Sequence, residues 1–176
     1  MTPEFVGWLT DRGFLDSVNS AQEERLRAAT ETPLSPEQQL RWVEALADLV
    51  AEKWAATDPP GLATARTAIT FLRTEAAERD HWWRSPRIEI DAVEDYLCIA
   101  IDQILEDEVD ISSEMHPLDQ SHDVADHDAE GCAECLKQFA LQDAHIDEVR
   151  GTIASMILHA HDLALVSPAY VSTEES

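Results

Sequence analysis

Two cysteines and two histidines in the last third of the chain have a spacing that suits a metal ion. The segment from His122 to Cys135 reads HDVADHDAEGCAEC, which places the four side chains as H-x4-H-x4-C-x2-C. Two thiolates separated by two residues can turn toward one tetrahedral ion, and soft thiolates together with imidazole select zinc among the common ions. The sequence therefore predicts a structural zinc ion with four ligands. They are His122, His127, Cys132 and Cys135.

Other interpretations of this cluster stay open. His116 or His145 could replace His122 as the fourth ligand, and three protein ligands with a bound water would make the site that of a zinc metalloenzyme. The C-x2-C pair could instead be a redox dithiol, which commonly lies in a βαβ context that this sequence lacks, or two cysteines without a ligand. A deaminase site is not indicated, because the chain has no H-x-E and no proline before Cys132.

The cluster is similar to the H-x3-C-x2-C motif of zinc-containing anti-sigma factors. It differs by one residue, since four residues separate His127 from Cys132, and the similarity covers less than a tenth of the chain. A small helical regulator is compatible with this resemblance, and no functional residue is carried over from that family.

The charge of the chain is strongly acidic and unevenly distributed. It has 36 acidic and 12 basic residues and a formal net charge of −24, and residues 91–148 hold 18 acids against one base, Lys137. Such a surface repels phosphates, which excludes nucleic acids and anionic membranes as direct partners. A basic partner protein, a bound cation or a halophilic source would each account for the acidity.

The expected partner surface combines acidic residues with one aromatic pair. The acidic members are Glu94, Asp102, Glu106, Asp107, Glu108 and Asp110. Trp82 and Trp83 join them, because adjacent residues of one helix cannot both face the core and an exposed tryptophan marks an interaction surface. If the chain bends there, both rings are buried, and burial against another subunit would make the protein a structural or assembly component. The leading hypothesis is a regulatory protein that binds a basic partner, one whose nucleic-acid-binding surface it would occupy.

Apolar periodicity indicates helices throughout and no strand pair. The length favours one domain over residues 1–176, and the pattern predicts an all-α, bundle-like domain of five or six helices. Seven segments have helical spacing, over about 3–13, 20–30, 36–57, 62–80 and 91–108, then from Cys132 and from Ala144 to Leu165. The segment 20–30 is polar with few apolar anchors and is expected on the surface, not in the core. Ser20 with Glu23 has the spacing of a capping box, and Asp91 is the expected cap of the fifth helix.

A long acidic loop is expected over 109–131, before the last two helices. Because it lacks apolar anchors, we expect the metal to order it, within a zinc-binding segment 109–145. The tail 168–176 is expected to fray. His159 and His161 point to different sides of one helix, so one should be buried and the other solvated. Three cysteines form no closed disulfide framework, and no signal peptide or membrane-spanning run is recognisable, which predicts a cytoplasmic protein.

Overall fold

The computed structural model describes residues 1–57, 59–78, 87–117 and 132–166, and within these ranges the chain forms six α-helices and no strand. This confirms the predicted all-α fold. The helices are α1 (Pro3–Asp11), α2 (Ser20–Glu31), α3 (Pro36–Lys53), α4 (Pro60–Glu78), α5 (Arg87–Met115) and α6 (Ala133–Leu165).

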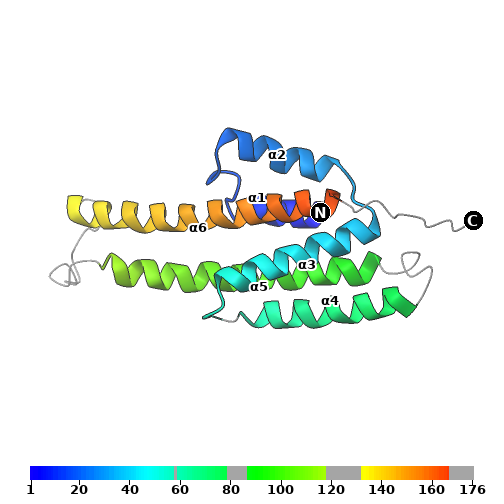
Figure 1. Ribbon diagram of the computed structural model, residues 1–176. Coiled ribbons are helices and arrows are strands. Elements are labelled where there is room, and N and C mark those ends of the chain that lie inside the picture. The colour runs from blue at the N-terminus through cyan, green and yellow to red at the C-terminus, as the bar shows by residue number, and fades with distance from the viewer. Residues whose placement is uncertain (58, 79–86, 118–131, 167–176) are drawn as a thin grey trace, which may run out of the picture.

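Helices α3 to α6 form an antiparallel four-helix bundle (Figure 1). Each runs opposite to the one before it, and the most extensive contacts are those of α3 with α6 and of α4 with α5. Helix α2 lies across the outer side of α6, and α1 packs against α5. The two shorter helices therefore cover the bundle, while α5 and α6 are its longest members.

One apolar cluster joins all six helices. The predicted stripes of α3, α5 and α6 are buried in it, among them Val43, Leu97 and Ile157. Trp42 lies at its centre with no exposed surface, donates a hydrogen bond from Nε1 to the carbonyl of Ile157 (3.4 Å), and meets the ring of Phe5 edge to face at 5.1 Å. Burial of such large side chains is the main source of folding free energy.

The ends of the first three helices follow local sequence rules. Ser35 caps α3 in a reciprocal capping box with Gln38. At α2 the prediction was one residue late: the cap is Asn19, which pairs with Gln22. Asparagine and serine cap equally well, so spacing alone did not decide between the two positions. Helix α1 ends just before Gly13, as expected. Gly13 has φ 71°, a left-handed conformation that glycine adopts without steric cost.

Three predicted boundaries in the acidic half are wrong. Helix α5 begins at Arg87, so Asp91 lies inside it, and it continues through Met115, so the start of the predicted loop is helical. The two helices expected from Cys132 and Ala144 are one helix, α6, because no glycine or proline interrupts residues 133–150. Residues 118–131 and the tail from 167 onward lie outside the described ranges.

Polar contacts explain why apolar periodicity did not reveal the end of α5. Ser112 is fully buried, and its hydroxyl donates to the carbonyl of Gln142 on α6 (3.4 Å). The amide of Gln142 donates in turn to the carbonyl of His116 (2.9 Å). Side chain–backbone hydrogen bonds thus join α5 to α6 where an apolar stripe is weak. Among the described helices, none has the length and hydropathy needed to cross a bilayer.

The two histidines near the end of α6 differ as predicted. His159 is exposed, whereas His161 is 5% exposed and its Nε2 has no hydrogen-bond partner. Burial is the main reason that the pKa of His161 lies below its ordinary value.

We expect His161 to make the protein less stable on mild acidification. Below the ordinary histidine pKa of about 6.5, the unfolded chain binds a proton that folded His161 rejects, so the free energy of unfolding decreases as the pH falls through this window. His161→Leu should remove up to about 1.4 kcal/mol per pH unit of that slope. Urea denaturation between pH 7 and pH 5 measures it. His159→Leu is the matched control, and an equal change of slope in both variants would contradict the assignment.

Candidate metal centre and acidic surface

The two predicted cysteine ligands lie together at the start of α6. Cys132 is the N-cap residue and is half-buried, and Cys135, in the first turn, is 2% exposed. The backbone N–H groups of Cys135 and Glu134 lower the pKa of the Cys132 thiol. A helix amino terminus favours the thiolate form, which is the form that binds metals.

The remaining predicted ligands are histidines. His122 and His127 lie outside the described residues. Of the two alternatives, His145 is engaged elsewhere, since its Nε2 lies 2.9 Å from Glu108 Oε2. Within the described ranges, no group of three or more metal-binding side chains comes together. The structure therefore places Cys132 and Cys135 one turn apart at the start of α6. That these cysteines and the histidines bind a metal is a prediction from the sequence.

The third cysteine has a different environment. Cys98 lies on α5 against the apolar core, and burial, with a smaller contribution from Glu94, raises its pKa to about 12. A thiol with so high a pKa is protonated at neutral pH and behaves as a small apolar side chain. This agrees with the interpretation from the sequence.

Beyond the end of α3, helices α5 and α6 continue as a pair. Trp54, the C-cap residue of α3, donates from Nε1 to Glu108 Oε1 at 2.9 Å, and the other oxygen of Glu108 faces His145. This bridge joins the end of α3 to both long helices. Residues 109–117 and 132–144, which we term the α5–α6 extension, project past it (Figure 1).

Two of the six acidic residues expected on the partner surface, Glu94 and Asp102, are held by side chains from the first 40 residues of the chain. The prediction for Glu94 is wrong, because this side chain is 2% exposed and accepts hydrogen bonds from Thr2 and Gln39. Asp102 accepts a bidentate pair of hydrogen bonds from the guanidinium of Arg12 (2.8 and 2.9 Å). The three donor residues lie far from these carboxylates in the sequence: Thr2 by 92 positions, Arg12 by 90 and Gln39 by 55. Helical spacing cannot detect contacts over such separations.

The other four lie where α5 leaves the body of the bundle. Glu106 and Asp110 are exposed, and Asp107 is half-buried and accepts a hydrogen bond from Gln103 (3.0 Å). Glu108 is half-buried in its bridge to Trp54. The remaining members of the predicted partner surface, Trp82 and Trp83, lie outside the described residues.

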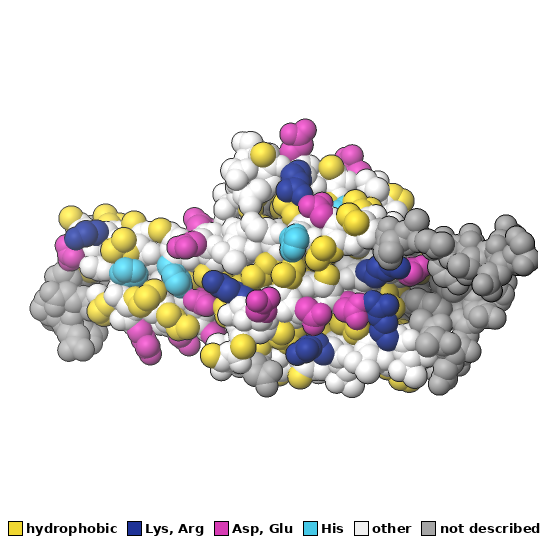
Figure 2. Space-filling view, viewed as in Figure 1, with side chains coloured by type: hydrophobic (Ala, Val, Ile, Leu, Met, Phe, Trp, Pro, Cys, Tyr) yellow, Lys and Arg dark blue, Asp and Glu magenta, His cyan; other side chains and the backbone are white. Residues whose placement is uncertain are grey.

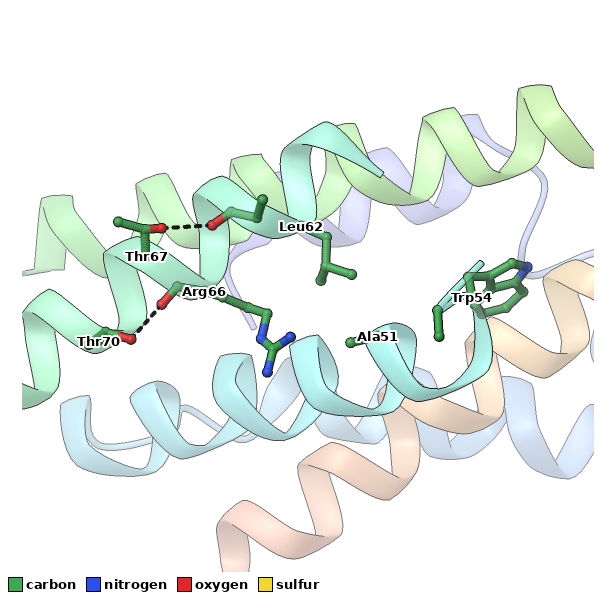
Figure 3. A pocket seen from close by; sticks show the side chains of 8 residues that line it. Ala51, Trp54, Leu62, Arg66, Thr67 and Thr70 are labelled. Carbon is green, nitrogen blue, oxygen red and sulfur yellow. Dashed lines mark hydrogen bonds between the residues drawn. The ribbon is translucent and has the colours of Figure 1, made fainter. Parts of the chain in front are cut away.

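A pocket of about 440 Å³ opens between α3 and α4 (Figure 3). The guanidinium of Arg66 points into the gap between the two helices and lies 3.8 Å from Asp48. The hydroxyls of Thr67 and Thr70 donate to carbonyls of their own helix. The polar groups that line the pocket are thus already engaged, and its space results from small side chains at Ala51 and its neighbours. Sequence reasoning did not identify this pocket.

Comparison with known proteins gives no relative: no protein family, curated protein or solved structure matches the chain at a significant level. Its function must therefore be inferred from its side chains and their arrangement.

Proposed function

We propose that this chain is a zinc-binding interaction protein, not an enzyme, which binds a basic partner protein through acidic surface on α5 and α6. The observation that carries the proposal is the pair of cysteines at the start of α6. Cys132 at the N-cap and Cys135 one turn later present two sulfurs from the amino end of one helix. This is the arrangement from which two thiolates reach one tetrahedral ion.

The donor set suits zinc in a closed, structural role. His122 and His127, which precede α6 in the chain, would complete two sulfur and two nitrogen ligands. A site with four protein ligands leaves no position for a reacting water, so its role is to stabilise the fold. Bound zinc contributes folding free energy, ~10–16 kcal/mol in small zinc peptides.

The acidic surface supports a basic partner. Residues 106–117 and 132–148 contain nine acidic side chains and one basic side chain, that of Lys137, which lies 3.9 Å from Glu134. Mutual repulsion among these carboxylates destabilises the free protein, and a basic surface would relieve it. Binding of this kind weakens as salt is added, since mobile ions screen the attraction. A nucleic-acid-binding protein presents such a basic surface, and occupying it would make this chain a regulator.

We expect the protein to contain one zinc ion per chain when it is purified without added metal. The double variant Cys132→Ser/Cys135→Ser should contain none, and a chelator should lower the Tm of the wild type but not that of the variant. Elemental analysis and thermal unfolding followed by circular dichroism measure both effects. Cys98→Ser is the matched control and should keep the metal, because Cys98 packs against the core of the bundle.

The zinc proposal fails if the reduced wild-type protein contains no metal and binds none on titration with Zn²⁺. It also fails if the double variant binds zinc as tightly as the wild type.

A further inference from the structure

An apolar patch lies on one side of the α5–α6 extension. Ile111 is 40% exposed, Met115 51% and Leu141 40%. The bridge between Glu108 and His145 defines this side. Ile111 and Met115 follow Glu108 by three and seven residues, and Leu141 precedes His145 by four, so helical geometry places all three on the side of that bridge. We term Ile111, Met115 and Leu141 the extension patch.

The described helices leave this patch open. Helix α3 ends at Lys53 and α4 begins at Pro60, and both lie on the body side of the Glu108 bridge (Figure 1). Figure 2 shows hydrophobic side chains gathered at the end of the molecule that α5 and α6 form, with acidic side chains around them. Elsewhere in the bundle, a third and a fourth helix bury the equivalent apolar faces. The extension thus has two helices of a bundle and room for another.

The charges around the extension patch are of one sign, with a single exception. On α5, Asp107 lies four residues before Ile111 and Glu114 lies three residues after it. On α6, Glu148 follows Leu141 by seven residues. Helical spacing therefore places these three carboxylates on the same side as the extension patch. Glu114 and Glu148 are exposed. The exception is Lys137, which lies near Glu134.

We propose that the extension patch is the docking site for an amphipathic helix of the partner protein, with lysine and arginine flanking its apolar stripe. The inference deepens the proposed function and rests on its basic partner, but not on zinc. A second copy of the chain fits poorly, because two extensions would bring together two sets of carboxylates with one lysine each. An anionic membrane surface is repelled for the same reason.

The two features of the site have separate roles. Apolar side chains at positions i, i+3 or i+4, and i+7 of the incoming helix would insert between Met115, Ile111 and Leu141, and this burial supplies most of the affinity. Methionine adapts its shape to different neighbours, which suits a surface that receives a helix. The carboxylates orient the basic flanks and speed the encounter.

A synthetic helical peptide tests the proposal. The probe carries leucine at i, i+3, i+4 and i+7 with lysine on both flanks. One companion peptide replaces the lysines by glutamate, and another replaces the leucines by serine. Fluorescence anisotropy at low and high salt should show binding of the leucine–lysine peptide alone, with affinity that decreases as salt is added. Met115→Ser/Leu141→Ser should weaken it at least tenfold, whereas Phe71→Ser, a 59% exposed position on α4, should not change it.

The other outcomes separate this inference from the proposed function. If the serine–lysine peptide binds equally well, or the patch variant binds as the wild type does, the attraction is electrostatic only: the docking site is refuted and the basic partner is not. If no basic peptide binds even at low salt, the partner part of the proposed function fails as well. If sedimentation shows a wild-type dimer that Met115→Ser/Leu141→Ser dissociates, a second copy occupies the patch and the inference is overturned.

Discussion

Gly61→Ala is expected to destabilise the protein by about 3 kcal/mol, at the upper end of the usual cost of overpacking. A Cβ at this position would lie 2.6 Å from the carbonyl oxygen of Tyr96 and 2.7 Å from the amide nitrogen of Ala100. Both atoms belong to the backbone of α5, so they cannot rotate away as a side chain could. The methyl group must push α4 off α5, one of the most extensive helix pairs in the bundle.

Gly7→Ala is the matched control for this experiment. A Cβ at Gly7, in the middle of α1, meets nothing within 4 Å. Because alanine favours the helix over glycine, this variant should be more stable than the wild type by about 0.5–1 kcal/mol. Chemical denaturation measures the free energy of unfolding of both variants and of the wild type. If Gly61→Ala is as stable as the wild type, α4 and α5 are not in close backbone contact at Gly61.

Glu94→Ala is expected to cost about 3 kcal/mol, because it leaves buried hydrogen-bond donors without an acceptor. Oε2 of Glu94 accepts from the backbone N–H of Thr2 at 3.1 Å and from its hydroxyl at 2.5 Å, and Oε1 accepts from Gln39 Nε2 at 3.1 Å. The same hydroxyl caps α1 by accepting from the N–H of Phe5 (3.2 Å). One carboxylate thus fixes the start of α1 to α5 and to α3. Asp95→Ala, at the exposed neighbouring position, should change stability little.

The charge of Glu94 gives the experiment a second readout. Burial raises the pKa of Glu94 above its ordinary value, despite the hydrogen bonds from Thr2 and Gln39. Between the ordinary and the raised value, the folded protein holds more protons than the unfolded chain, so the Glu94 contribution to the free energy of unfolding decreases as the pH rises.

Glu94→Gln cannot titrate, and its amide oxygen can still accept from Thr2. Its stability relative to the wild type should therefore improve as the pH rises through that window. A pH-independent difference between Glu94→Gln and the wild type would contradict the assignment.

The helical class and the positions of most helices follow from the sequence, because they depend on local patterns. Val43 and Val50 of α3 and Leu97 and Ile101 of α5 recur at helical spacing, and all four are buried. Ser35 predicted the start of α3 for a similarly local reason, since its hydroxyl bonds to the backbone three residues later. Local patterns also predicted that Cys132 lies at the start of a helix, as it does. The two histidine ligands, His122 and His127, stay predictions.

Contacts between distant parts of the chain could be identified only from the tertiary structure. Glu94 looks like a surface residue in an acidic helix, yet Thr2 and Gln39 converge on it from two other helices and bury it. Glu108, counted among the partner residues, instead joins Trp54 to His145.

Contacts between distant residues also determine how far the two long helices, α5 and α6, extend. The end of α5 is held by Ser112 and Gln142 through polar contacts across to α6, which leave no apolar period in the sequence. Hydrophobic spacing reports which face of a helix is buried. It does not report which polar groups meet across helices, because such pairs depend on where the chain returns, and that is determined by the packing of the whole bundle.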